Sequence, residues 1–355
     1  MKILVTSRDV GSAKQNLAFI ENIFVFNLPA EIKILAQQPA SKIFEKSNFK
    51  CTILNEDSEE VCESVLEKFK PDFVLLGLSG FGTGIDETTR RLCKIKKIKC
   101  GVIQDYWGYT GQFDQDSLPN YFFVLDRQAE RLTSLNTKDK ANCIVTGSPK
   151  HEQYIYKIKK WSSQNPFNPL KKSLFLVGQP YEIPGYVENI KYFFNALEEV
   201  SGSFDLFIKD HPNNEKEIYS EILKKYSYPF HIMSDDQSIE SALFNASIVV
   251  NCFSTAGLDH SYMQFYSEKN IGGLLYLSIG VDIKNFFKES VGPIDIEDLV
   301  SGMGLVANSY EDIITKLNKI FDYNYHNYKI NVLNNLSNVQ HPSLKIYKFL
   351  ESKIF

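Results

Sequence analysis

The tripeptide Asp210-His211-Pro212 places a histidine where it could contact a bound ligand. It follows 204–209, whose apolar pattern predicts a strand, and it precedes 214–226, which has helical spacing. The imidazole therefore lies on a strand-to-helix turn, and open α/β sheets bind ligands outside the carboxyl ends of their strands. Proline fixes φ at the next position and donates no backbone hydrogen bond. A turn histidine without a ligand explains the same pattern equally well.

A second group of polar residues lies in CFSTAGLDH (252–260), which follows a predicted strand and opens a helix. Hydroxyl groups and unblocked amides at a helix N-terminus suit a phosphate. Ser254 or Thr255 acting only as an N-cap would use the same geometry, so that alternative stays open. The residues that we expect to bind a nucleotide are His211, Lys209, Ser254, Thr255, Gly257, Gln179 and Gly178.

Four acidic residues in the N-terminal half could act as a general base. Asp9 lies in SRDVG, Asp86 and Glu87 lie in GIDET, and Asp105 lies in QDYWG. A carboxylate within hydrogen-bond reach can remove the proton of a substrate hydroxyl. Asp86 and Glu87 fall in the first turn of a predicted helix, where a carboxylate also stabilises the helix dipole without any catalytic role.

Other polar and aromatic groups have simpler interpretations. Asp235-Asp236 is expected to cap or turn the chain rather than to bind a metal, and His260 is expected to be a satisfied helix residue. Tyr106, Trp107 and Tyr109 are expected to pack in the core, although aromatic rings beside glycine also form sugar platforms. GFGTGID lacks the ribose-binding acid of a dinucleotide fingerprint, so we expect no NAD cofactor.

Apolar runs that predict strands alternate with segments of helical spacing. The strands predicted in the first half are 3–5, 32–35, 51–54, 73–76, 101–103, 122–125 and 143–145. The helices between them lie near 12–24, 58–69, 85–97 and 126–135. After 162–172 the strands are SLFLVG, 206–209, FHIM and SIVVNC, and the helices are 185–200, 214–226, 238–244 and one from Ser254. This βαβ series predicts parallel sheets covered by helices on both faces.

The expected fold class is α/β, with two Rossmann-like domains facing each other across a cleft. We assign 1–161 to an acceptor domain, 162–172 to a linker rich in Pro, Asn and Ser, and 173–324 to a donor domain. The segment 325–355 is expected to be helical and to pack back on the first domain.

Composition excludes several classes of protein. The chain has 355 residues, 43% of them hydrophobic, and a formal net charge of −4, which argues against a nucleic-acid partner. The six cysteines show no metal-ligand or disulfide spacing, which favours a cytoplasmic protein without a metal site. No apolar run approaches the ~20 residues of a membrane span. Two basic segments, 90–99 and 154–161, are read first as solvated faces and second as patches for an anionic membrane surface or a polyanionic glycan.

The sequences KDHP and FSTAG resemble the HP and Ser/Ser-Thr motifs of bacterial GT-B glycosyltransferases, particularly sialyl- and polysialyltransferases, capsule Kdo transferases and CDP-glycerol glycerophosphotransferases. VTGSPKHE (145–152) is also similar to the domain junction of these proteins and of UDP-N-acetylglucosamine 2-epimerases. The resemblance implies that His211 contacts the donor phosphate beside Ser254 and Thr255. It also favours Glu87, then Asp86, as the base, with Asp9 as the fallback. The sialyltransferase base motif ends in Gly where this chain has Thr88.

The resemblance implies a metal-independent glycosyltransferase without a cofactor. It would move a nonulosonic acid or a Kdo-type sugar from a nucleotide-activated donor, expected to be CMP-linked, to a bacterial surface glycan or glycolipid acceptor at the inner face of the membrane. One alternative is a non-hydrolysing sugar-nucleotide epimerase, although the acid-rich SGG loop usual in such enzymes is not found here. The other alternative is a non-catalytic glycan- or nucleotide-binding protein.

Overall fold

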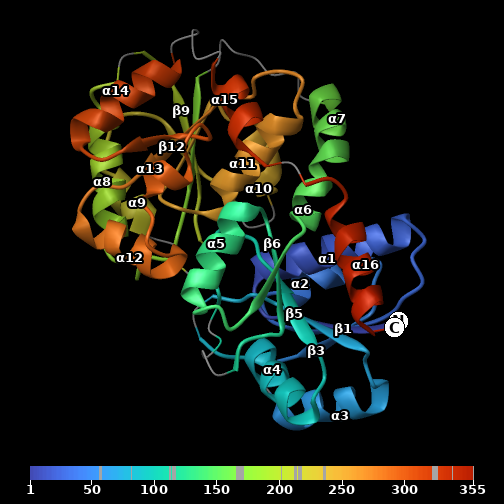
Figure 1. Cartoon of the computed structure of the whole chain (residues 1–355). Coiled ribbons are helices and arrows are strands. Elements are labelled where there is room, and N and C mark those ends of the chain that lie inside the picture. The colour runs from blue at the N-terminus through green and yellow to red at the C-terminus, as the bar shows by residue number, and fades with distance from the viewer. Residues whose placement is uncertain are drawn as a thin grey trace. The chain divides into compact units, whose positions relative to one another are not determined.

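The computed structural model divides the chain into two compact units (Figure 1). Unit 1 comprises Met1–Gln153 with Ser337–Phe355, and unit 2 comprises Tyr154–Leu336. The residues that the structure describes are 1–55, 58–80, 82–111, 113, 117–164, 172–200, 202–211, 214, 218–234, 237–321, 327–337 and 339–354.

Unit 1 is built on a parallel sheet of seven strands in the order β3-β2-β1-β4-β5-β6-β7. Its strands are β1 (Lys2–Ser7), β2 (Glu31–Gln37), β3 (Cys51–Leu54), β4 (Phe73–Leu76), β5 (Cys100–Ile103), β6 (Tyr121–Val124) and β7 (Asn142–Val145). Its helices are α1 (Val10–Val25), α2 (Ser41–Glu45), α3 (Glu59–Phe69), α4 (Ile85–Lys96), α5 (Arg127–Asn136), α6 (Pro149–Glu152) and α16 (Pro342–Ile354). The order reverses direction between β1 and β4, which makes that pair the switch point of the sheet.

Unit 2 repeats this plan with a parallel sheet of six strands in the order β10-β9-β8-β11-β12-β13. Its strands are β8 (Ser173–Val177), β9 (Asp205–Lys209), β10 (Phe230–Ile232), β11 (Ile248–Asn251), β12 (Gly273–Leu277) and β13 (Leu305–Ala307). Its helices are α7 (Tyr154–Gln164), α8 (Tyr186–Leu197), α9 (Ile218–Leu223), α10 (Ile239–Asn245), α11 (Thr255–Tyr266), α12 (Val281–Val291), α13 (Ile296–Leu299), α14 (Tyr310–Phe321) and α15 (Asn327–Asn335). Its switch point lies between β8 and β11.

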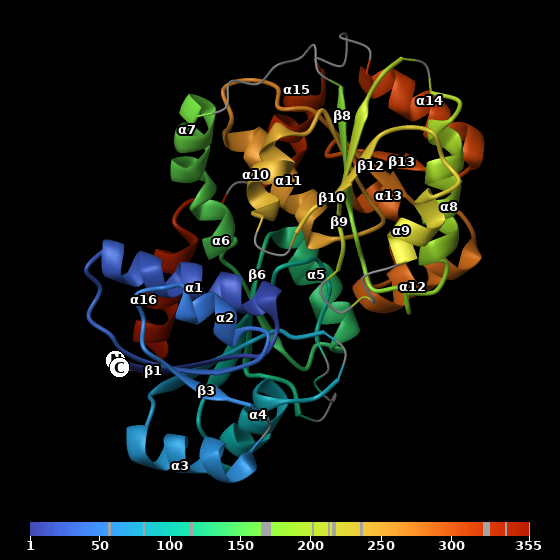
Figure 2. The same ribbon diagram turned by 180° about the vertical axis from the view of Figure 1, so that it is seen from behind.

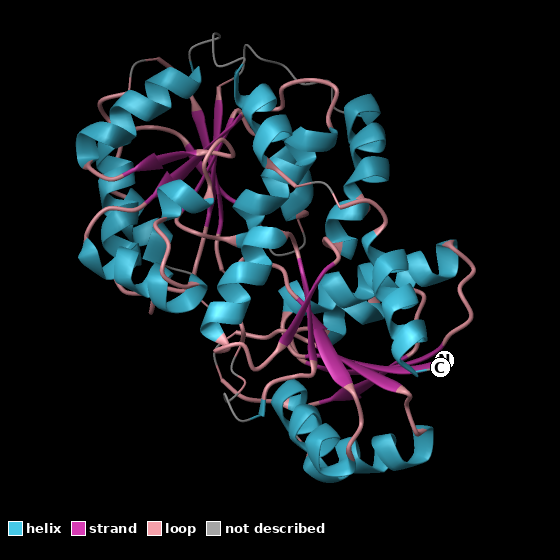
Figure 3. Cartoon of the chain, in the orientation of Figure 1, coloured by secondary structure: helices cyan, strands magenta, loops and turns pink. Residues whose placement is uncertain are grey.

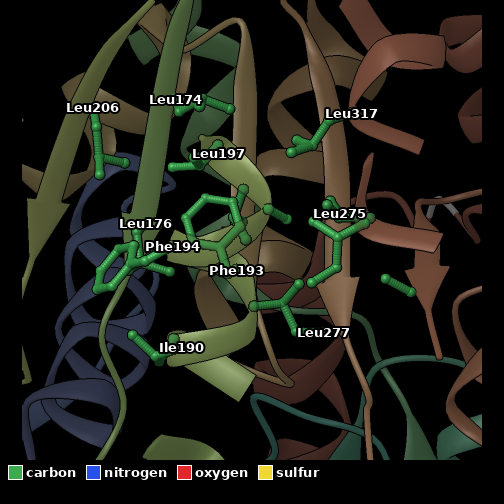
Figure 4. Packing of buried hydrophobic residues seen from close by; sticks show 14 of the residues in the cluster. Leu174, Leu176, Ile190, Phe193, Phe194, Leu197, Leu206, Leu275, Leu277 and Leu317 are labelled. Carbon is green, nitrogen blue, oxygen red and sulfur yellow. The ribbon is translucent and has the colours of Figure 1, made fainter. Parts of the chain in front are cut away.

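The central strands are buried along their whole length because helices cover both faces of each sheet, as Figures 2 and 3 show. All four residues of β4 and all four of β11 are buried. Such strands are continuous apolar runs rather than alternating ones. In unit 2, Phe193 and Phe194 of α8 fill the space against Leu174 of β8 and Leu275 of β12 (Figure 4). The predicted pair of doubly wound α/β domains is confirmed.

The C-terminal helix α16 belongs to unit 1, although it follows the whole of unit 2 in the sequence. Its residues Ile346 and Leu350 join Phe19 and Ile20 of α1 in one apolar cluster. The carboxylate of Glu152 accepts hydrogen bonds from Asn22 Nδ2 (2.8 Å) and Ser343 Oγ (3.1 Å). Buried apolar area and a buried polar junction thus hold this segment in unit 1.

The unit boundaries differ in part from the domains expected from sequence. The segment 154–161, expected in the first domain, forms α7 of unit 2 together with Ser162, Ser163 and Gln164 of the expected linker. The remainder of that linker, 165–171, lies outside the described residues. Of the expected C-terminal segment 325–355, α15 lies in unit 2 and α16 in unit 1.

His260 lies in the middle of α11 and is completely buried. Its Nδ1 is 3.1 Å from the carbonyl oxygen of Leu243, and its ring stacks on Tyr328. Burial disfavours the imidazolium and lowers the pKa of His260 to about 4. The folded protein therefore keeps this imidazole neutral at pH values where the unfolded chain already binds a proton.

We predict that His260 makes unit 2 less stable in mild acid. Below about pH 6.5 the unfolded chain binds more protons than the folded one, so the free energy of unfolding falls by up to ~1.4 kcal/mol per pH unit until about pH 4. Chemical denaturation at several pH values will measure this slope. His260→Asn should show a shallower slope than the wild type, and His231→Asn, at an exposed position, should not. Equal slopes in all three proteins would contradict the assignment.

Candidate active site

The carboxylate of Asp86 links the ends of the two strands at the switch point of unit 1 through hydrogen bonds. Asp86 lies in the first turn of α4, and its side chain is completely buried beneath the ends of β1 and β4. The oxygen Oδ1 accepts hydrogen bonds from Thr6 Oγ1 (2.6 Å) and Gly77 N (2.9 Å). The oxygen Oδ2 accepts from Arg8 N (3.0 Å) and Ser79 Oγ (2.8 Å). Burial raises the pKa of Asp86, while these four donors favour its ionised form.

Gly77 leaves room for this carboxylate. A Cβ at Gly77 would lie 2.7 Å from Asp86 Oδ2 and 2.8 Å from Ser12 Oγ, which is too close for either pair of atoms. The glycine and the aspartate therefore fit only as a pair. With every lone-pair direction of its carboxylate already used, Asp86 positions the turns around it rather than contacting a substrate.

Glu87 is the neighbouring residue on α4, but its carboxylate has a different environment. Its Oε2 accepts a hydrogen bond from Gly84 N (2.8 Å), whereas Oε1 is buried and has no hydrogen-bond partner among the described residues. Burial, reinforced by the negative charge of Asp86 and opposed by Arg8, raises the pKa of Glu87 to about 7. A carboxyl group with this pKa can both accept and return a proton near neutral pH.

Arg8 follows β1 and brings a positive charge to Glu87, a role that we did not predict from the sequence. Its Nη2 donates hydrogen bonds to the carbonyl oxygens of Gly80 (2.9 Å) and Gly82 (3.0 Å). Its Nε lies 4.0 Å from Glu87 Oε2, and both side chains are 12% exposed. A Cβ at Gly84 would lie 2.5 Å from Arg8 Cδ, so the glycine-rich loop is shaped around this arginine.

The other two acids expected at the site lie near the N-terminus of α1. Asp9 Oδ2 accepts a hydrogen bond from Gly80 N (2.6 Å), and its Oδ1 is 3.6 Å from Arg8 Nη1. A Cβ at Gly11 would lie 3.1 Å from Asp105 Oδ2, which places Asp105 beside the first turn of α1. Unit 1 thus brings all four predicted acids to the carboxyl ends of β1, β4 and β5.

Of the three aromatic residues that follow β5, two are core residues as expected. Tyr106 and Trp107 are buried, and the indole of Trp107 donates a hydrogen bond to Asp126 Oδ2 (3.0 Å). Tyr109 instead donates a hydrogen bond to the carbonyl oxygen of Ser79 (3.1 Å), beside the Asp86 carboxylate. Its phenol therefore lies at the switch point of unit 1.

In unit 2, Gln179 performs the bridging role that Asp86 performs in unit 1. It follows β8, is almost completely buried, and accepts hydrogen bonds at Oε1 from Cys252 N (3.0 Å) and Phe253 N (3.1 Å). A Cβ on the preceding Gly178 would lie 2.9 Å from the backbone of Asp210 and His211. Gly178 thus permits the close approach of the β8 and β9 turns.

The β9 turn around His211 is held by its neighbours. Asp210 accepts hydrogen bonds from Tyr181 Oη (3.0 Å), His211 N (2.7 Å) and Asn214 Nδ2 (2.6 Å). Asn214 also donates to the carbonyl oxygen of Gln179 (2.9 Å), so the turns after β8 and β9 form one network. The imidazole of His211 is half-buried in this turn, and Pro212 lies outside the described residues.

The residues at the start of α11 have the expected capping geometry. Ser254 is the N-cap, and its Oγ accepts a hydrogen bond from Ala256 N (3.2 Å). Its own amide donates to Asn251 Oδ1 (2.9 Å). Thr255 is the first helical residue, and a Cβ at Gly257 would lie 2.7 Å from Tyr276 Oη. Gly257 therefore allows α11 to pack closely on the sheet. Ser254 and Thr255, at the start of the helix, are half-buried.

The side chain of Lys209 reaches the turn after β10, where its Nζ donates a hydrogen bond to the carbonyl oxygen of Ser234 (2.5 Å). Asp235 and Asp236 lie outside the described residues. Within the described part of the chain, no group of three or more His, Cys, Asp or Glu residues could hold a metal ion, and no helix is long and apolar enough to cross a membrane.

Comparison with known proteins reveals similarity of structure but not of sequence. No protein-family profile matches the chain, and neither does any curated protein sequence. UDP-GlcNAc 2-epimerase from Neisseria meningitidis, bound to UDP-GlcNAc, has a TM-score of 0.68 at 17% identity, covering 99% of this chain and 100% of that one. The Methanocaldococcus jannaschii enzyme, in complex with UDP-GlcNAc and UDP, has a TM-score of 0.67 at 13% identity, covering 99% and 100%. MurG from Acinetobacter baumannii has a TM-score of 0.59 at 9% identity, also covering 99% and 100%.

These similarities confirm the GT-B fold class. They do not support the sialyltransferase, Kdo transferase or CDP-glycerol subtype, and they overturn the predicted CMP-dependent glycosyltransferase. The similar structures are predominantly UDP-GlcNAc 2-epimerases, so the epimerase alternative is better supported. The prediction relied on motifs of two to five residues that lie on turns, and such turns recur throughout this fold.

We predict that Asp86→Asn destabilises unit 1. In either orientation, the amide nitrogen of the new side chain would face a backbone N–H group, that of Gly77 or that of Arg8. That N–H group would lose its acceptor, which lowers the free energy of unfolding by about 1–3 kcal/mol when the donor is buried. Thermal unfolding should therefore show a lower Tm. Asp72→Asn is the matched control, because Asp72 is exposed and accepts one backbone hydrogen bond, from Lys2 N (2.7 Å). An Asp86 variant as stable as this control would contradict the bridging role.

Proposed function

We propose that the protein is a sugar-nucleotide epimerase that acts on a UDP-linked sugar. The observation that carries the proposal is Glu87, a carboxyl group with a pKa of about 7 held beside Arg8 at the switch point of unit 1. The solved epimerases of similar fold, some bound to UDP-GlcNAc or UDP, support the choice of substrate class. UDP-GlcNAc is accordingly the first substrate to test.

Epimerisation at a carbon that bears hydrogen requires removal of that proton and its return on the opposite face. The group that removes the proton must be ionised and should have a pKa near 7. The Glu87 carboxyl group has such a pKa and is ionised above about pH 7. The buried Oε1, which has no hydrogen-bond partner among the described residues, is the atom that we assign to the proton transfer. The electron pair of the broken C2–H bond would expel UDP from the neighbouring anomeric carbon, and UDP would add back as a proton returns to the opposite face of C2. Arg8 would offset the negative charge beside Glu87 during the proton transfer.

The other acids of unit 1 receive supporting roles in this proposal. Asp86 positions the turns after β1 and β4, and its negative charge contributes to the raised pKa of Glu87. Asp9, which bonds Gly80 N, and Asp105, beside Gly11, are candidates for the second proton-transfer group. The inversion needs a group on each face of the carbon, so one of these two acids would act opposite Glu87.

Unit 2 would hold the UDP part of the substrate. We assign the diphosphate to His211 and to the start of α11, where Ser254 and Thr255 offer hydroxyl groups at a helix N-terminus. Gln179 fixes the turn that leads into this helix, and Gly178 allows the His211 turn to approach it. Lys209 would contribute long-range positive charge.

The direct test follows UDP-GlcNAc by proton NMR in D₂O with the purified protein. We predict that the C2 epimer forms and that both epimers acquire deuterium at C2, because the proton removed exchanges with solvent. Glu87→Gln should lower turnover by at least about 100-fold, the usual contribution of a general base, while UDP affinity stays unchanged. The wild-type rate should rise with pH through about pH 7 as Glu87 ionises.

Glu60→Gln is the matched control, because Glu60 is an exposed carboxylate in the first turn of the neighbouring helix α3. Its turnover should equal that of the wild type. Tight binding of UDP without any deuterium incorporation would contradict the epimerase proposal. It would favour a nucleotide-binding protein without this activity. Full activity of Glu87→Gln would remove Glu87 from the reaction while leaving the epimerase intact.

A further inference from the structure

The two basic segments of the sequence have different surroundings in the structure. In the segment 90–99, Arg91 pairs with Glu59 (2.9 Å), and Lys96 pairs with Glu63 (2.8 Å). Lys96 also pairs with Glu67 (2.9 Å), so acids of α3 pair with two of the six basic residues in this segment. In the segment 154–161, which forms most of α7, Lys159 and Lys160 are exposed and make no ion pair within the described residues.

The buried face of α7 explains how the helix is anchored. Tyr154 and Ile158 are buried, and Trp161 packs against Phe244 of α10. Figures 1 and 2 show α7 lying beside α10 and α11 at the margin of unit 2. The exposed residues on the opposite face, away from these contacts, are Ile155, Tyr156, Lys159 and Lys160.

That opposite face combines exposed apolar and basic side chains. Ile155 is 37% exposed and Tyr156 is 67% exposed. Lys159 and Lys160 follow them by four residues each, which places each lysine one turn along from an apolar side chain on the same face. The helix carries no acidic residue. A helix with exposed apolar and aromatic groups interspersed with lysine is typical of a surface that lies on an anionic bilayer.

We propose that this face of α7, formed by Ile155, Tyr156, Lys159 and Lys160, docks on the surface of an anionic lipid bilayer. The apolar side chains would enter the headgroup region, and the flexible lysine side chains would reach the lipid phosphates around them. A soluble polyanion would satisfy the lysines but would leave Ile155 and Tyr156 exposed, which is why the lipid surface is the better fit. The contact is independent of the chemistry proposed for Glu87.

Co-sedimentation of the full chain with vesicles tests the proposal. We expect binding to phosphatidylcholine vesicles that contain phosphatidylglycerol, little binding to phosphatidylcholine alone, and loss of binding at high salt. The double variant Lys159→Glu/Lys160→Glu should weaken binding by at least about 25-fold, since each lysine near an anionic surface contributes about fivefold. Tyr156→Ser should weaken binding by roughly tenfold through lost apolar burial.

The matched control is Lys191→Glu/Tyr192→Glu on α8 of the same unit. Tyr192 is 42% exposed, and Lys191 is exposed three residues after Glu188, so this surface has a similar composition but a balanced charge. The control should bind vesicles as the wild type does. Equal binding to both kinds of vesicle, or an equal loss in the control, would overturn the proposal. Sensitivity to the lysines but not to Tyr156 would also overturn it, in favour of a site for soluble polyanions.

Discussion

The arrangement of the candidate site depends on one buried carboxylate, Asp86. A charged group without water is costly to bury unless its hydrogen bonds are satisfied, and here four donors satisfy it. Those donors come from the ends of β1 and β4, so the carboxylate fixes both turns against the start of α4. Because Asp86 is held there, Glu87 occupies the next position of the helix, facing Arg8 and the glycine-rich loop. The raised pKa of Glu87 then follows from its burial and from the charge of Asp86.

Unit 2 links the two strand ends at its switch point through a neutral side chain rather than a buried carboxylate. Its switch point also joins two strand ends that must stay close, and the neutral amide of Gln179 accepts the two backbone hydrogen bonds that hold them. The adjoining turn after β9 carries Asp210, whose carboxylate accepts hydrogen bonds within the turn, and His211. The proposed function assigns proton transfer to unit 1 and nucleotide binding to unit 2.

The fold could be predicted from the sequence further than the site could. Strand β4 is an unbroken apolar run between turn residues, and β11 is one up to its last residue, Asn251. This pattern alone indicates a sheet covered on both faces. The apolar run around β12 fits a strand or a buried helix equally well, so the sequence alone does not predict this strand. The four acids lie at strand ends as expected, but the burial of Asp86 depends in part on Thr6, which is eighty residues away in sequence. Arg8 was missed because its partners are carbonyl oxygens of a loop more than seventy residues away.

The proposed reaction requires the Glu87 carboxyl group to exchange a proton near neutral pH. A ¹³C NMR titration of the side-chain carboxyl carbons measures this property, with the Glu87 signal assigned by its loss in Glu87→Gln. We predict a titration midpoint near 7 for this carboxyl group. A midpoint near the ordinary glutamate value of about 4.3 would contradict it.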